Sequence, residues 1–260
     1  MAVADRHPPE APIHRGPPRP TSPPESDDGI AAERDRMGSH PFLLAFREGA
    51  FSLDFARQIA SMQVGYNLEV IVALTRMRRT LAHHPAFVWK FLDPLLATEF
   101  GGDLDAVGLH QQGVSHVKMI YDLTRSLGME GAALRAWGPE ASRFFDEALN
   151  GLIGGACPAA AMGALYANEV FATAWYPALF EGFQAFSNRC DTALDLVFLE
   201  SHGGAIELSH VEHVVQLLNY REALGLERAA FSDGYRRFSA ALERKFTALH
   251  QQLMDERGAA

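Results

Sequence analysis

Apolar side chains recur every three or four positions along most of the chain from residue 40 onward. Two long stripes show this spacing: Phe55, Ile59, Met62, Tyr66, Val70, Ala73 and Met77, and then Tyr235, Phe238, Leu242, Phe246, Leu249 and Leu253. This period is typical of amphipathic helices. We find no strand-like alternation, no βαβ rhythm and no repeat. The predicted fold class is therefore all-α, a single domain of seven or eight helices over residues 39–256.

Turn and cap residues divide this domain into helices. Ser52 can cap a helix that runs to about residue 83, Gly128 can end one that begins at His116, and Pro139 can begin one that runs to residue 155. We expect a kink at Pro94 in a helix over 86–100. A further helix is expected to begin at residue 158 and to break at Pro177, because proline lacks the amide donor, with another helix over 181–200.

Residues 1–38 differ in composition from the rest of the chain. They contain eight of the 14 prolines and very few large apolar residues. Such a segment cannot bury enough surface to offset the entropy lost on ordering. We therefore predict that residues 1–38 form a disordered, proline-rich tail.

The composition narrows the class of protein. A formal net charge of −9 and a hydrophobic content of 48% suit a soluble, acidic protein and give no case for binding nucleic acid. Two cysteines form no disulfide framework, which favours a reducing cytoplasm. The N-terminus lacks a signal-peptide pattern, and we predict no membrane-spanning segment.

The chemistry is concentrated in residues 198–220, FLESHGGAIELSHVEHVVQLLNY. At about 100° per residue, His202, His210 and His213 lie within roughly 80° of one another on a regular helix, whereas Glu207 lies roughly 140° from His202. Imidazole with carboxylate favours iron or manganese. A π-bulge at Gly203–Gly204 would turn Glu207 towards the histidines, because it absorbs one residue. We predict such a distortion there.

Four segments, in this order, resemble the haem-oxygenase-like helical superfamily, which includes thiaminase-like and pyrroloquinoline-quinone-synthase-like proteins. The segments are HPFLLAFREGAFS (40–52), TEFGGDLDAVGLHQQGVSHVKMIYDLTRSLGM (98–129), ALYANEVFATAWYPALFEGFQAF (164–186) and FLESHGGAIELSHVEH (198–213). The resemblance covers about residues 40–250. It implies a haem-oxygenase-like bundle.

The resemblance also implies the six metal ligands of the di-iron oxidase and oxygenase branch: Glu99, His116, Glu169, His202, Glu207 and His210. Two features depart from the family pattern. Four residues rather than three separate His202 from the acid, which is Glu rather than Asp, and the loop before His116 is long. If the bulge is absent, His213 is the substitute ligand.

Further residues stay open as candidates. Glu69 could supply an extra carboxylate, and His110 could replace His116. Cys157 lies where thiaminase-like relatives carry a nucleophile. The aromatic candidates for a substrate pocket are Phe100, Tyr166, Phe171 and Trp175.

The leading hypothesis is a non-haem di-iron enzyme that holds two irons per chain and uses dioxygen to oxidise a small molecule in specialised metabolism. Amines, amino acids and fatty acids are all open as substrates. The alternatives are a metal-free enzyme of the same fold, either thiaminase-like or a cofactorless oxidase, and a non-catalytic binding protein. A homodimer and an external electron donor also stay open.

Overall fold

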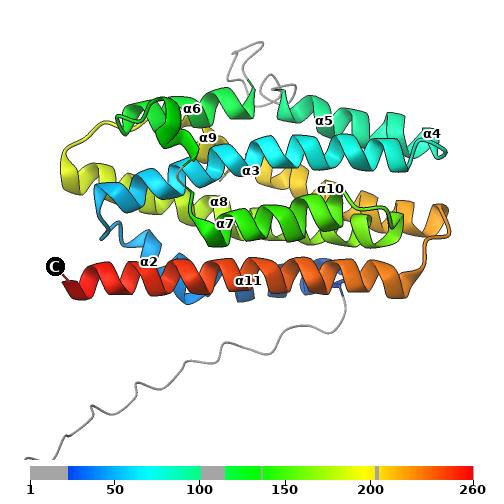
Figure 1. The fold of residues 1–260 in the computed structure, drawn as a ribbon. Coiled ribbons are helices and arrows are strands. Elements are labelled where there is room, and N and C mark those ends of the chain that lie inside the picture. Colours follow the sequence, from blue (N-terminus) through cyan, green and yellow to red (C-terminus); the bar gives the residue numbers. More distant parts are fainter. Residues whose placement is uncertain (1–22, 101–114, 136, 203–204, 260) are drawn as a thin grey trace, which may run out of the picture.

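The protein is an elongated bundle of helices (Figure 1), seen in a computed structural model that describes residues 23–100, 115–135, 137–202 and 205–259. The α-helices are α1 Asp27–Gly38, α2 Pro41–Arg47, α3 Leu53–Thr80, α4 Pro85–Phe87, α5 Asp93–Glu99, α6 His116–Ser126, α7 Pro139–Phe144, α8 Pro158–Cys190, α9 Val197–His202, α10 Ala205–Ala223 and α11 Arg228–Ala259. Two π-helical turns and a 3-10 turn accompany them: η1 Val88–Leu92, η3 Phe145–Ile153 and η2 Gly131–Arg135. The described residues form no strand, which confirms the predicted all-α class.

Several predicted helix ends are confirmed. The Ser52 hydroxyl accepts a hydrogen bond from the Phe55 amide at 3.0 Å, Gly128 follows α6 with φ +71°, and Pro139 begins α7. The predicted break at Pro177 is wrong, because α8 continues through it to Cys190. Burial explains this result: Tyr176, Ala178 and Leu179 are nearly inaccessible, and their packing compensates for the hydrogen bond that proline cannot make.

The segments are more numerous than the seven or eight predicted helices. The predicted helix over 86–100 consists of α4, η1 and α5, and η1 lies just before Pro94. The stretch over 198–220 is divided between α9 and α10. Local changes of helical hydrogen bonding are invisible to a hydrophobic period, so the sequence pattern merges these pieces.

Helix α8 is the centre of the bundle and packs against α11, α10, α2 and α1. Glycine on each helix allows α8 and α11 to cross closely. A Cβ on Gly163 of α8 would lie 1.9 Å from the Phe231 carbonyl oxygen, and one on Gly234 of α11 would lie 1.9 Å from the Ala160 oxygen. The crossing therefore has no room for a methyl group on either side.

We expect Gly163→Ala to lower the free energy of unfolding by about 1 to 3 kcal/mol, because the helices must separate. This loss should appear despite the gain of about 1 kcal/mol that alanine brings to a helix. Chemical denaturation measures it. Gly258→Ala, in the open end of α11, is the control and should be neutral or slightly stabilising. Equal stability of the two variants would contradict this account of the crossing.

Part of the predicted disordered tail is structured. Helix α1 begins after Ser26, whose hydroxyl accepts a hydrogen bond from the Gly29 amide at 3.2 Å, and it buries Ile30 and Met37. These two residues are seven apart, so they lie on one face of the helix. Residues 23–38, which we call the N-terminal strap, are therefore part of the folded structure. The predicted boundary between tail and domain at residue 38 is wrong. Residues 1–22 lie outside the described residues.

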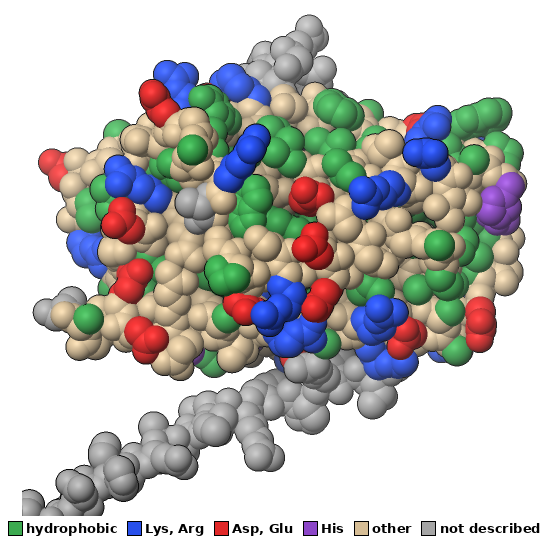
Figure 2. Space-filling model, viewed as in Figure 1, with side chains coloured by type: hydrophobic (Ala, Val, Ile, Leu, Met, Phe, Trp, Pro, Cys, Tyr) green, Lys and Arg blue, Asp and Glu red, His purple; other side chains and the backbone are tan. Residues whose placement is uncertain are grey.

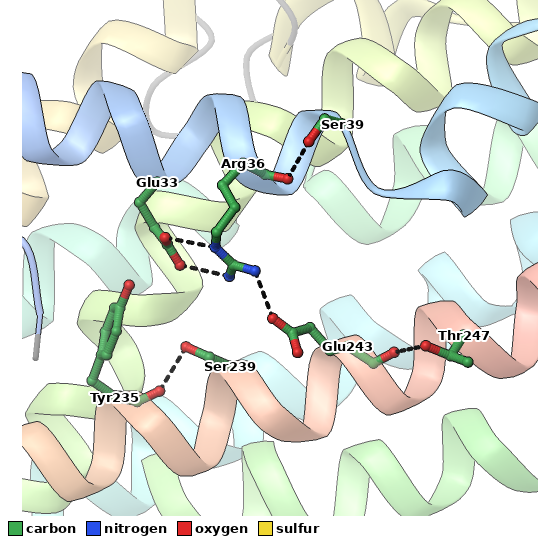
Figure 3. Close-up of polar contacts among 7 residues, drawn as sticks. All are labelled: Glu33, Arg36, Ser39, Tyr235, Ser239, Glu243 and Thr247. Carbon is green, nitrogen blue, oxygen red and sulfur yellow. Dashed lines mark hydrogen bonds and ion pairs between the residues drawn. The ribbon is translucent and has the colours of Figure 1, made fainter. Parts of the chain in front are cut away.

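Polar contacts fasten the strap to the bundle. Arg36 donates to both carboxylate oxygens of Glu33 and, at 2.7 Å, to Glu243 of α11 (Figure 3). This bidentate geometry is the favoured one for arginine and a carboxylate. Glu25 accepts hydrogen bonds from Arg221 at 2.9 Å and Arg228 at 2.8 Å, and the Arg221 bond contributes most to lowering the pKa of Glu25.

The face of the molecule in Figure 2 is mixed in charge, with acidic and basic side chains interspersed over it. Among the described helices, none combines the length with the apolar composition that a membrane span requires.

Candidate metal centre

Five helices each contribute one histidine or glutamate to a single cavity inside the bundle. The five are Glu99 from α5, His116 from α6, Glu169 from α8, His202 from α9 and His213 from α10. The rest of the described lining consists of Tyr66, Asn67, Val70, Leu95, Thr98, Asn168, Ala172 and Tyr176. We call this space the polar cavity. It gathers four of the six predicted ligands together with the predicted substitute.

Glu99 and His116 are brought together although a long loop separates them in the sequence. Glu99 is the last residue of α5 and His116 the first of α6, and the Oε2 and Nδ1 atoms lie 3.3 Å apart. The His116 ring is also perpendicular to that of His202, with centroids 4.6 Å apart. Three of the predicted ligands are therefore immediate neighbours.

His202 is held in a defined orientation by its own helix. Its Nδ1 lies 2.8 Å from the Phe198 carbonyl oxygen, one turn earlier in α9. A carbonyl only accepts, so Nδ1 carries the proton and, in the neutral ring, the lone pair lies on Nε2. A backbone carbonyl on one nitrogen is the usual way in which a histidine is oriented to bind metal through the other.

Glu169 is buried in α8 and lies at the end of a polar chain. The Tyr66 hydroxyl donates to Asn168 Oδ1 at 2.5 Å, and Asn168 Nδ2 donates to Glu169 Oε1 at 3.4 Å. On the other side, Glu169 Oε2 lies 3.6 Å from His213 Nδ1. A buried carboxylate needs such partners, because an isolated charge in an apolar interior is very costly.

Tyr66 and Tyr176 keep their protons at neutral pH. Burial is the main cause that raises the pKa of each phenol above its usual value. The carboxylates of Glu169 and Glu99 raise the pKa of both phenols further. The cavity therefore combines two carboxylates and three imidazoles with two neutral hydroxyl donors.

The remaining predicted residues either are not described or do not line the polar cavity. The side chains of Glu207 and His210, the glycine pair 203–204 and His110 lie outside the described residues, so the predicted bulge stays a prediction. α9 ends at His202 and α10 begins at Ala205, on either side of that pair. Glu69 does not line the cavity and instead accepts a hydrogen bond from Asn150 at 2.8 Å. Cys157 is exposed and is also absent from the lining.

Two of the four aromatic pocket candidates line a second space. This apolar cavity is lined by Tyr66, Phe144, Asn168, Phe171, Ala172, Trp175, Tyr176, Phe238 and Leu242, and it shares Tyr66, Asn168, Ala172 and Tyr176 with the polar cavity. Tyr166 is not there, because it is fully buried and its hydroxyl donates to the Pro24 carbonyl of the strap. Phe100 is also absent, since it is 58% exposed after α5.

Sequence reasoning missed Tyr66, Asn168 and Tyr176, which form the boundary between the two cavities. The sequence did indicate a polar role for Asn168, because it is an amide next to a glutamate in an otherwise apolar run. It gave no such indication for the two tyrosines, since aromatic residues at helical spacing are most often part of the core.

The donor set fits a metal that prefers carboxylate and imidazole. In the part of the chain that the structure describes, no three His, Cys, Asp or Glu side chains are already close enough to hold an ion together. Binding would therefore need the carboxylates and rings around the polar cavity to converge, and Glu207 and His210 to join them.

Comparison with known proteins supports the fold. Neither a family model nor a curated protein sequence matches the chain. Two crystal structures of a CADD-like protein of unknown function from Nostoc punctiforme match it with 14% sequence identity and TM-scores of 0.63 and 0.61. They cover 87% of this chain and 97% and 95% of the matched chains. The chain therefore has the all-helical bundle fold of the CADD-like proteins.

Proposed function

We propose that the protein is a non-haem di-iron oxidase or oxygenase that acts on a small molecule. The observation that carries the proposal is the polar cavity, where five helices each contribute one histidine or glutamate. Glu99, His116, Glu169 and His202 are proposed ligands. Glu207 and His210 complete the set, and His213 replaces one of them if Glu207 faces away. Two bound irons would supply the activation of dioxygen.

Helix spacing supports a role for His210. It precedes His213, which lines the cavity, by three residues in α10, and residues three apart are neighbours on a helix surface. Glu207 precedes His210 by another three and lies roughly 120° from His213 around a regular helix. Spacing therefore supports His210, and Glu207 rests on the resemblance.

The surrounding residues position the donors and keep protons in place. The Phe198 carbonyl fixes the tautomer of His202, and the Asn168 amide orients Glu169. The Tyr66 hydroxyl donates to Asn168 and so supports Glu169, whereas the neutral hydroxyl of Tyr176 can donate a hydrogen bond to a bound substrate. The apolar side chains around the second cavity exclude water from one side of the polar cavity.

Oxygen uptake tests this function. We expect protein reconstituted with iron(II) under anaerobic conditions to consume oxygen on mixing with air-saturated buffer, at least about tenfold faster than the same amount of free iron(II). The zinc-loaded protein is the control, since zinc has no redox chemistry. Uptake no faster than that of free iron would contradict the proposed activity.

A further inference from the structure

The apolar cavity is a void that the packing of the bundle leaves open next to the polar cavity. Its volume is about 20 Å³, and the described residues that line it are buried, apart from the partly buried Tyr66. Protein interiors contain few voids larger than a water molecule, because side chains that line a void lose packing contacts. A void in this position therefore calls for an explanation.

The volume limits what the cavity can hold. A cavity needs roughly 10–15 Å³ to hold one water molecule. The apolar cavity therefore admits a diatomic molecule, whereas a carbon chain or an aromatic ring does not fit. This size excludes organic substrates and leaves water and small gases as the candidate occupants.

The polarity of the lining favours a gas over water. The Tyr66 hydroxyl donates to Asn168, and the Asn168 amide donates to Glu169, so these groups already have partners. Two other side-chain groups remain at the wall, the Tyr176 hydroxyl and the Trp175 Nε1 atom, which is buried without a hydrogen-bond partner in the described structure. A buried water typically makes about three hydrogen bonds, so this wall holds water poorly.

A buried amine lies nearby but is shielded from the cavity. Lys245 of α11 is 1% exposed, and its Nζ lies 3.7 Å from the centroid of the Trp175 ring and 4.1 Å from that of Phe144. These two rings line the cavity, whereas Lys245 does not. Burial also lowers the pKa of Lys245 well below its usual value, which favours the neutral amine. The described walls of the cavity are therefore uncharged.

We propose that the apolar cavity is a binding site for dioxygen, which passes Ala172 from there to reach the polar cavity. Dioxygen is small and apolar, and transfer of an apolar solute from water into apolar surroundings is favourable. Tyr66, Asn168, Ala172 and Tyr176 line both cavities. Alanine has the smallest side chain of the four, so the wall between the cavities is thinnest at Ala172.

The site would supply the gas at the side of the metal centre that is closed to water. In assigning the gas to that centre, the inference rests on the proposed function. Gas binding itself needs no iron, so the two proposals can fail separately.

Xenon crystallography on the metal-free full-length protein tests the inference. Xenon is an apolar atom with strong anomalous scattering, so it marks cavities that hold apolar gases. In crystals pressurised with xenon, we expect one xenon atom among Phe144, Phe171 and Phe238, and none in the polar cavity. An ordered water molecule in the apolar cavity, or xenon in the polar cavity alone, would overturn the proposal.

Three variants on α11 separate the size of the cavity from general effects on the core. Leu242→Phe should fill the cavity and remove the xenon site, whereas Phe238→Leu should enlarge the cavity and raise the occupancy. Phe231→Leu is the matched control and should keep the wild-type occupancy, since Phe231 is buried in the same helix but does not line the cavity. Phe238→Leu carries the test alone if Leu242→Phe does not fold. Xenon absent from both the wild type and Phe238→Leu would contradict the proposal.

Oxygen kinetics separate this inference from the proposed function. In the iron-loaded protein, Leu242→Phe should raise the KM for dioxygen several-fold and keep kcat, because it removes binding of the gas and no step of the reaction. A KM equal to that of the wild type would show that dioxygen does not use the cavity. Xenon binding in a protein that consumes no oxygen would leave the gas site in place and overturn only the proposed function.

Discussion

Glu169→Gln is expected to lower the affinity for iron(II) by about 100-fold or more and to abolish oxygen uptake. Glu169 is buried in the polar cavity and is fixed from two sides, by the Asn168 amide and by His213. Even residues that only orient metal ligands change metal affinity by about 10- to 100-fold, so removal of a ligand charge should cost at least as much. Glutamine keeps the size and one acceptor oxygen, so the fold should survive.

Glu69→Gln is the matched control. Glu69 is also a glutamate on a bundle helix, but it binds Asn150 instead of lining the cavity. It should keep the iron affinity of the wild type, measured by competition with a chromophoric chelator. If Glu169→Gln keeps full iron loading, Glu169 is not a ligand. If Glu69→Gln loses iron, the extra-carboxylate hypothesis for Glu69 returns.

Met37→Ala is expected to destabilise the protein by about 2 to 5 kcal/mol, which corresponds to a fall in Tm of roughly 5 to 15 °C. Met37 is 1% exposed and belongs to the core although it lies in the strap. Its removal leaves a cavity beneath α1. The strap also holds Tyr166 and Glu243 through Pro24 and Arg36, so the effect should spread to α8 and α11.

A variant that lacks residues 1–22 is the control for this test. Removing residues 1–22 should leave Tm unchanged, because that segment is rich in proline and poor in large apolar residues. Differential scanning calorimetry of both variants measures the two effects. A Tm for Met37→Ala within about 1 °C of the wild type would show that the strap does not stabilise the bundle.

The sequence predicted α3 and α11 well, because long stripes such as Phe55 to Met77 have a strong period. It predicted the interruptions of helices poorly. The predicted helix over 181–200 is wrong, since α8 ends at Cys190 and α9 begins only at Val197. Proline at 177 looked like a break, but packing on both sides of α8 outweighs one lost hydrogen bond. The strap was missed because its helix buries only a few apolar residues, and Ile30 and Met37 are too sparse to form a recognisable stripe.

The candidate site depended on a different kind of information. The resemblance brought Glu99, His116, Glu169 and His202 together, and the structure places all four around the polar cavity. Helical spacing alone could not have paired residues from separate helices. The aromatic candidates could not be sorted from the sequence in this way. Tyr166 and Phe171 lie on the same helix, but Tyr166 binds the strap and Phe171 lines the apolar cavity.

The buried Lys245 was also beyond sequence reasoning. Lys245 lies between Leu242 and Phe246 of the α11 stripe. The pattern predicts that this position is at the edge of an amphipathic helix, next to solvent. Only the packing of α11 against α7 and α8 shows that this edge is enclosed.

The number and location of bound irons test the central claim most directly. We would grow crystals of the iron-loaded protein under anaerobic conditions and collect anomalous diffraction at the iron edge. The account predicts two iron peaks per chain in the polar cavity, bounded by Glu99, His116, Glu169, His202 and the α10 residues Glu207 and His210. A cavity without iron after full reconstitution, or a single iron held by His202, His210 and His213 alone, would contradict it.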